Sequence, residues 1–107
     1  MFNNDRLDRL DSKYILIKIT KSNNNNKKYD ANIMNNETGK ITLVPFGNIN
    51  KRHYRDTTEL KIYSHLDHWD LKLRNEYIEL NKKKFEGIKN KFSSDYFTAR
   101  FLYSLRI

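Results

Sequence analysis

The chain has 107 residues, a formal net charge of +8 and a pI near 9.7, and it contains no cysteine. A chain of this length fits one domain with a small core, and the lack of cysteine excludes disulfides, thiolate metal sites and zinc fingers. No apolar run approaches the roughly 20 residues that a membrane-spanning helix needs, so we expect no membrane segment.

Residues 1–12 hold too few apolar side chains to keep a helix in place. Leu7 and Leu10 are set among acids and arginines, which is enough for a short stretch of helix only. We therefore predict an N-terminal arm over residues 1–12 and a single domain over residues 13–107. The start also lacks the apolar region of a secretory signal, so we expect an intracellular protein.

The next segment alternates apolar and polar residues with the period of a strand. Within residues 13–20, Ile15, Ile17 and Ile19 recur at every second position. This pattern predicts a strand with the isoleucines directed toward the core. Residues 22–28 are turn formers without any apolar side chain, and they predict an exposed hairpin loop.

Two further strands are predicted, over residues 29–34 and 40–46. Gly39 lies between them and can supply the positive φ of a tight turn. Pro45 cannot donate a hydrogen bond to a neighbouring strand, so we expect it at the end of its strand or on the edge of the sheet. The three strands together predict an antiparallel meander whose apolar face needs a cover.

A helical period follows and predicts the longest helix of the chain. Asp67 is its expected N-cap, the cations of residues 82–84 lie near its negative end, and Gly87 is its expected stop. One apolar face comprises Leu66, Trp69, Leu73, Tyr77 and Leu80. The opposite face comprises Leu71, Ile78 and Phe85, so we expect this helix to be buried on two sides.

The C-terminal segment is rich in aromatic residues and predicts a shorter helix. Ser94 is the expected N-cap. The apolar members are Tyr96, Phe97, Ala99, Phe101, Leu102, Tyr103 and Leu105. The predicted fold class is therefore α+β, with a three-stranded antiparallel sheet covered by one long helix and a short C-terminal helix. If this segment were not packed there, its aromatic surface would be a partner interface.

The polar segment before the long helix has no clear period, but it carries a family resemblance. Its residues are His53-Tyr54-Arg55-Asp56-Thr57-Thr58, Leu60-Lys61, Tyr63-Ser64-His65-Leu66-Asp67-His68, and then Asp70, Lys72, Arg74 and Tyr77. Together with Phe46-Gly47 before them and Tyr96-Phe97 through Tyr103 after them, they resemble a family of small proteins of nucleocytoplasmic large DNA viruses. These viruses include the mimivirus and phycodnavirus groups. The resemblance covers roughly residues 29–105.

The sequence departs from the family pattern at several positions. Leu80 and Asn81 stand where the family tends to have arginine and histidine, and Phe101 and Tyr103 stand in place of terminal tryptophans. Proline would also be expected where the chain has Glu59 and Leu71. The resemblance brings no established activity. It implies a viral origin and a location in the host cytoplasm, the viral factory or the virion.

Histidines and aspartates cluster around the start of the long helix. We predict that they form a structural polar network that fixes the loop to the helix. Its members are His53, Asp56, His65, Asp67, His68 and Asp70. Such ligands also suit zinc, iron or manganese, and His65 and His68 would share a helix face. No motif such as HExxH supports that alternative, so we predict no metal and no cofactor.

The same side chains suggest a second alternative, a hydrolase or nuclease. A histidine would act as general base near neutral pH, and an aspartate would orient it. The chain has neither a nucleophile elbow nor a glycine-rich phosphate loop, and it contains only three glycines. We therefore predict that the protein is not an enzyme.

The surplus of positive charge favours a polyanionic partner, of which nucleic acid is the commonest. The predicted phosphate contacts are Lys51, Arg52, Arg55, Lys61, Lys72, Arg74, Lys82, Lys83, Lys84, Lys89 and Lys91. Glu76, Glu79 and Glu86 interrupt this row, and no RRM, KH or zinc-finger pattern is present. We therefore expect binding without sequence specificity. Abundant asparagine and lysine are also what an AT-rich genome encodes.

A competing class of function is a virion structural or protein-interaction component. A protein of this class, such as a minor capsid or packing protein, would dock on virion proteins through an aromatic helix face. A contiguous basic face over a closed core favours nucleic acid, whereas an exposed aromatic patch favours protein assembly. The sequence does not distinguish a monomer from an oligomer, or DNA from RNA.

Overall fold

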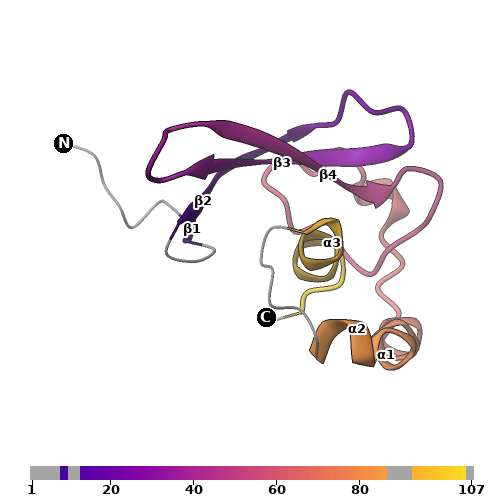
Figure 1. Cartoon of the computed structure of the whole chain (residues 1–107). Helices are drawn as coiled ribbons and strands as arrows, with labels where there is room; N and C mark the ends of the chain where they lie inside the picture. The colour runs from indigo at the N-terminus through magenta and orange to yellow at the C-terminus, as the bar shows by residue number, and fades with distance from the viewer. Residues whose placement is uncertain (1–7, 10–12, 87–92, 106–107) are drawn as a thin grey trace.

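The computed structural model describes residues 8–9, 13–86 and 93–105. A four-stranded antiparallel sheet has the order β1-β2-β3-β4, with β1 (Asp8–Arg9), β2 (Tyr14–Lys21), β3 (Lys27–Asn35) and β4 (Ile41–Asn48). The helices are the 3-10 helix η2 (Ser64–Leu66), α1 (Leu71–Leu80), α2 (Lys82–Glu86) and α3 (Ser94–Leu102). Figure 1 shows the sheet at the top, α3 beneath it, and α1 and α2 at the bottom.

The predicted α+β class and the antiparallel meander are confirmed, because β2, β3 and β4 occupy the three predicted strands and pair as neighbours. Gly39 has a φ of 74° in the turn between β3 and β4, as predicted. Pro45 lies in β4, which is an edge strand. Within the stretch predicted as an arm, Asp8–Arg9 pairs with Leu16 and Ile15 of β2.

Strand β2 does not keep a strict alternation along its length. Its register to β3 shifts between Leu16 and Lys18. Leu16 before the shift and Ile19 after it both belong to or pack on the main core cluster, whereas Ile15 is buried outside that cluster. The expectation of one shared isoleucine face is therefore wrong, because the extra residue of a β-bulge moves the following side chains to the other face.

Helix α3 supplies most of the side chains that cover the sheet. The ring centroids of Phe46 in β4 and Phe97 in α3 are 5.7 Å apart. Ser93 caps α3 by accepting the N–H of Tyr96, one residue before the predicted cap at Ser94. The buried core cluster comprises Leu16, Tyr29, Ala31, Ile33, Phe46, Tyr63, Tyr96, Phe97 and Leu102. Full burial of a Leu or Phe side chain stabilises a fold by about 1.5–3 kcal/mol, so this cluster holds α3 on the sheet.

The order of the helical layers differs from the prediction. The predicted long helix is divided, because α1 ends at Leu80 and α2 begins at Lys82. No side chain of α1 is buried, and Leu80 is 87% exposed. Instead, α1 packs on the end of α3, where the rings of Tyr77 and Tyr103 stack with centroids 3.6 Å apart. The more apolar α3 takes the place on the sheet, because it has more apolar surface to bury there.

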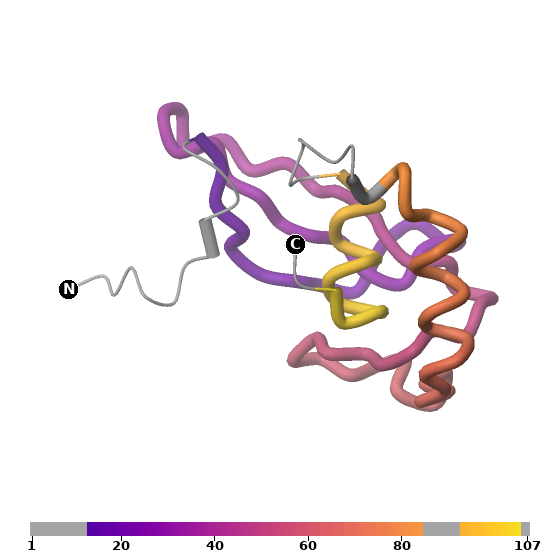
Figure 2. The backbone as a smooth tube through the Cα atoms, turned by 90° about the horizontal axis from the view of Figure 1, so that it is seen from below, coloured from indigo at the N-terminus to yellow at the C-terminus, as the bar shows by residue number. Residues whose placement is uncertain are grey.

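The segment of residues 49–70, which we call the connecting segment, links β4 to α1 and passes the C-terminal end of α3 on the way (Figure 2). In the described part of the chain, no helix combines the length and the apolar character needed to cross a membrane. The predicted helix stop at Gly87 lies outside the described residues.

Candidate nucleic-acid interface

Backbone hydrogen bonds hold the two ends of the connecting segment together. His53 and Asp67 form an isolated parallel bridge. Beside it, the N–H of His68 donates to the carbonyl of His53 at 2.9 Å, and the N–H of Trp69 donates to the carbonyl of Tyr54 at 3.1 Å. The stretch that follows β4 and the stretch that precedes α1 therefore lie side by side.

A network of side chains fastens the same bridge from inside. Nε2 of His53 lies 2.5 Å from Oδ1 of Asp67, and this oxygen also accepts the N–H of Asp56 at 2.7 Å. A carboxylate can only accept, so Nε2 is the nitrogen of the neutral ring that carries the proton. The Asp56 carboxylate accepts from the hydroxyls of Tyr29 and Thr58. The predicted structural network is therefore confirmed for His53, Asp56 and Asp67.

The other three predicted members, His65, His68 and Asp70, make contacts outside this network. The Asp70 carboxylate accepts the backbone N–H groups of Lys72 and Leu73 in the first turn of α1, so Asp70 caps that helix. The predicted cap at Asp67 is wrong, because the network already uses that carboxylate. Nδ1 of His68 accepts the N–H of Asp70 at 3.0 Å, and the exposed ring of His65 lies 6.1 Å from that of Tyr63.

Burial shifts the pKa of several groups in and around the network. Burial, followed by the positive charge of Lys28, lowers the pKa of His53, although its carboxylate partner opposes the shift. Burial and the hydrogen bond to Asp56 raise the pKa of Tyr29 to about 12. Burial lowers the pKa of Lys28 to about 8, and its ammonium group donates to the carbonyl of Lys51 at 2.7 Å.

The network does not form an open metal site or an accessible general base. Among the described residues, no group of three or more His, Asp or Glu side chains is placed to hold a metal ion. Nδ1 of His53, on the ring edge away from Asp67, is buried and has no hydrogen-bond partner in the described part of the chain. A substrate proton would have to reach this buried atom before His53 could remove it.

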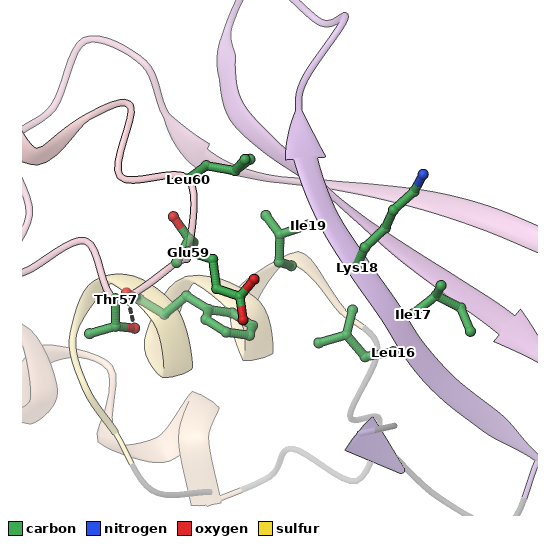
Figure 3. Close-up of a pocket in the computed structure, with 9 residues that line it drawn as sticks. Leu16, Ile17, Lys18, Ile19, Thr57, Glu59 and Leu60 are labelled. Carbon is green, nitrogen blue, oxygen red and sulfur yellow. Dashed lines mark hydrogen bonds between the residues drawn. The ribbon is translucent and has the colours of Figure 1, made fainter. Parts of the chain in front are cut away.

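A cavity of about 340 Å³ lies between β2 and the connecting segment (Figure 3). Its lining residues are Leu16, Ile17, Lys18, Ile19, Thr57, Thr58, Glu59, Leu60 and Phe101. The Thr57 hydroxyl donates to the Phe101 carbonyl at 2.8 Å and ties the connecting segment to α3. The Lys18 side chain points away from Glu59 in Figure 3, so the cavity wall brings together no acid–base pair.

A surface rich in arginine and aromatic rings lies over the parallel bridge. We call it the Arg–Trp surface, and its members are Arg52, Tyr54, Arg55, His68, Trp69 and Arg74. Cζ of Arg55 is 4.9 Å from the ring centroid of Trp69, and Cζ of Arg74 is 5.5 Å from that of Tyr54. The Tyr54 ring is 6.1 Å from both the Trp69 and the His68 ring. Cations and π-faces are thus interleaved at one place.

Trp69 has an unusual backbone conformation on this surface. Its φ is 55°, and its side chain is 58% exposed. A bulky residue held in the left-handed region stores on the order of 1–3 kcal/mol of strain. The sequence pattern placed Trp69 on a buried helix face, and that interpretation is wrong because the helix begins only after Asp70. No signal in the sequence marks a left-handed tryptophan.

The predicted phosphate-binding residues are dispersed over the connecting segment and the first two helices. Exposed members are Lys51, Arg52, Arg55, Lys61, Lys72, Lys82, Lys83 and Lys84. The half-buried guanidinium of Arg74 donates to the carbonyls of Tyr103 and Ser104 at 2.7 and 3.2 Å, which fixes these two residues after α3 against α1. Lys84 pairs with Asp95 at 3.8 Å, an exposed contact of small energy. Lys89 and Lys91 lie outside the described residues.

Comparison of the chain with protein-family models, with curated proteins and with solved structures finds no match in any of the three. The family resemblance of the connecting segment therefore stays a prediction. The Arg–Trp surface, which displays cations and rings together, is the feature of the described residues that bears most directly on binding.

Proposed function

We propose that this protein binds nucleic acid without sequence specificity, through contacts between Lys and Arg side chains and phosphates. The observation that carries this proposal is the Arg–Trp surface, where the exposed Arg55 lies over Trp69 and the exposed Arg52 bonds to the Asp67 carbonyl. The exposed Lys51 and Lys72 flank this surface in the chain. The net charge of +8 adds long-range attraction to a polyanion. Phosphate contacts position a nucleic acid but carry no sequence information.

Two cations of the region have structural roles instead. Arg74 directs its guanidinium to backbone carbonyls, and Lys28 is only 1% exposed. Because these side chains are half-buried or buried and already donate to backbone carbonyls, we expect them to contribute little to phosphate binding. The expected contacts come from Lys51, Arg52, Arg55, Lys61, Lys72, Lys82 and Lys83.

The test is a fluorescence-anisotropy titration with a labelled duplex and a labelled single strand over a series of salt concentrations. Binding should weaken steeply with salt, with a log–log slope of about 0.9 for each duplex phosphate neutralised and about 0.7 for each in a single strand. Arg52→Ala and Arg55→Ala should each reduce that slope by about one.

Lys40→Ala is the matched control for these variants. It removes the same charge from an exposed residue in the turn between β3 and β4, at the end of the sheet away from the connecting segment (Figure 1). Its affinity and salt slope should stay close to those of the unaltered protein. The proposal fails if the unaltered protein binds neither probe at low salt, or if Lys40→Ala weakens binding as much as Arg52→Ala does.

The second candidate is the virion structural or protein-interaction role. It is favoured by α1, which exposes Leu71, Leu73 and Leu80 to solvent. Exposed apolar patches on monomers often mark protein interfaces. Under this alternative, Leu80→Lys would abolish assembly measured by sedimentation velocity with a virion protein, while the affinity for nucleic acid would not fall. The viral origin itself remains a prediction of the resemblance.

A further inference from the structure

Trp69 is the sole tryptophan of the chain, and more than half of its surface is exposed to solvent. Large aromatic side chains contribute most to stability when they are buried, so an indole held in solvent contributes little to the core. The backbone at this residue is also left-handed, with a φ of 55°. The stability of the folded chain therefore does not explain why Trp69 has an exposed ring and a left-handed backbone.

The strained residue is fixed from both sides. Its own N–H donates to the Tyr54 carbonyl, and the preceding His68 N–H donates to the His53 carbonyl. The Asp70 carboxylate then caps α1 immediately after it. These contacts hold the Trp69 backbone in place whether or not the ring has a ligand, so the ring is preorganised for binding.

The surroundings of the ring select the chemistry of its ligand. Arg55 lies over the indole, and the exposed Arg52 bonds to the Asp67 carbonyl beside the bridge. An apolar protein partner that covered the ring would have to desolvate the Arg55 guanidinium, which is unfavourable without a paired acid. A ligand that has both a flat π-face and negative charge satisfies the ring and the cations together.

Single-stranded nucleic acid has these two properties along its whole length. Its bases can turn a face toward an aromatic ring, and its phosphates can meet arginine and lysine. In a duplex the base faces are already covered by neighbouring bases, so only the phosphates are available without unstacking. Every base has a π-face, so stacking of this kind tolerates any sequence.

We infer that Trp69 is a stacking platform for a base of single-stranded nucleic acid, with Arg52 and Arg55 contacting the adjoining phosphates. This inference rests on the proposed function and names the strand state that the same surface prefers. It predicts that the protein binds a single strand more tightly than a duplex of the same sequence. It also assigns that difference to one side chain.

The test compares Trp69→Gly and Trp69→Phe with the unaltered protein on a labelled 12-nucleotide single strand and the matching duplex, about the length of one small site. Glycine adopts a positive φ without a Cβ clash, so Trp69→Gly should fold, which circular dichroism checks. We expect Trp69→Gly to weaken single-strand binding about tenfold or more, and duplex binding less than twofold. Trp69→Phe should retain most of the single-strand affinity, because it keeps an aromatic face.

Tryptophan fluorescence gives a second readout, because all of the signal comes from Trp69. Stacking of a base on the indole should quench this emission when the single strand is added to the unaltered protein. The duplex should bind through phosphates with little quenching.

The outcomes separate this inference from the proposed function. If the unaltered protein binds both probes equally and Trp69→Gly changes neither affinity, stacking is overturned while phosphate binding stands. If Trp69→Gly folds normally but weakens both probes to the same extent, single-strand selectivity is overturned. If the unaltered protein binds neither probe, the proposed function fails, and the stacking platform fails with it.

Discussion

Oδ1 of Asp67 lies 2.5 Å from Nε2 of His53, and this contact fastens the stretch after β4 to the stretch before α1. The same oxygen accepts the N–H of Asp56, so one carboxylate satisfies two buried donors. The backbone bridge beside it sets the positions of Tyr54 and Trp69. The geometry of the Arg–Trp surface therefore depends on a side chain that faces away from solvent.

Removing the Asp67 carboxylate should destabilise the protein strongly. In Asp67→Ala, the His53 ring and the Asp56 N–H lose their acceptor in a buried place, and we expect the free energy of unfolding to fall by about 2–4 kcal/mol. Urea denaturation followed by Trp69 fluorescence measures this change. Asp70→Ala is the control, because it removes a carboxylate that caps α1 and should reduce stability by only about 1 kcal/mol. Equal losses in the two variants would contradict the central role of Asp67.

Acid should destabilise the protein through His53. Burial lowers the pKa of this histidine below its ordinary value of 6.5, so the unfolded chain binds a proton at a pH where the folded protein does not. The contribution to stability is complete above pH 6.5 and is lost as the pH falls through the lowered pKa of the folded state. Thermal unfolding by circular dichroism between about pH 8 and pH 5 should show this decline.

A variant series assigns the acid effect to one histidine. His53→Gln should flatten the decline, although it lowers stability at every pH by disturbing the contact to Asp67. His65→Gln alters an exposed histidine and should leave the shape of the pH profile unchanged. If His65→Gln flattened the profile and His53→Gln did not, the prediction that His53 causes the decline would be wrong.

Local patterns in the sequence predicted the elements that depend on near neighbours. The period-two run before Lys21 predicted β2, and Gly39 predicted the tight turn, because both depend on backbone sterics within a few residues. The proposal of a His/Asp network also succeeded for His53 and Asp67, because buried polar groups need partners close by. These predictions needed no knowledge of the layer order.

The sequence could not predict features that depend on competition between distant segments. Lys28 follows an asparagine run and was placed in an exposed loop, yet it is buried beneath the connecting segment, where it bonds to the Lys51 carbonyl. Asp67 was the predicted cap of the long helix, but its carboxylate is engaged by His53, and Asp70 caps α1 instead. Trp69 was accordingly placed inside the helix, whereas it lies before α1 with a φ of 55°.

The hydroxyl of Tyr29 should contribute measurably to stability. It donates to the buried Asp56 carboxylate and accepts the N–H of Ile62 at 3.0 Å. Tyr29→Phe removes both bonds, and we expect a loss of about 1.5–3 kcal/mol in urea denaturation. Tyr54→Phe is the matched control, because it keeps the ring that packs on Trp69 and changes no bond of this network. A loss in Tyr54→Phe as large as in Tyr29→Phe would contradict the assignment.

Ionisation of the same hydroxyl should destabilise the folded protein at alkaline pH. The pKa of Tyr29 is raised from 10.0 to about 12, so the folded protein keeps a proton that the unfolded chain has released. Its stabilising contribution is complete below pH 10 and is lost as the pH rises toward about 12. Ultraviolet titration of tyrosinate should show a late-ionising group that is absent in Tyr29→Phe. If the two titrations coincide, burial and the hydrogen bond to Asp56 do not raise the pKa of Tyr29 in this way.

Two glycines with similar backbones should respond differently to alanine. Gly47 has a φ of 78° and Gly39 a φ of 74°, so both substitutions impose the strain of a left-handed alanine, about 1 kcal/mol. A Cβ at Gly39 would meet nothing within 4 Å, whereas one at Gly47 would lie 2.9 Å from Cδ1 of Leu102 and 3.3 Å from Lys28.

Leu102 is almost fully buried in the core between α3 and the sheet, so it cannot move away without disturbing that packing. We therefore expect Gly47→Ala to lose about 1–3 kcal/mol more than Gly39→Ala, measured as the difference between their urea denaturation midpoints at equal slope. Equal midpoints would mean that Leu102 yields freely and that α3 is not closely packed where β4 ends. The size of the difference thus reports how tightly the C-terminal helix is seated on the sheet.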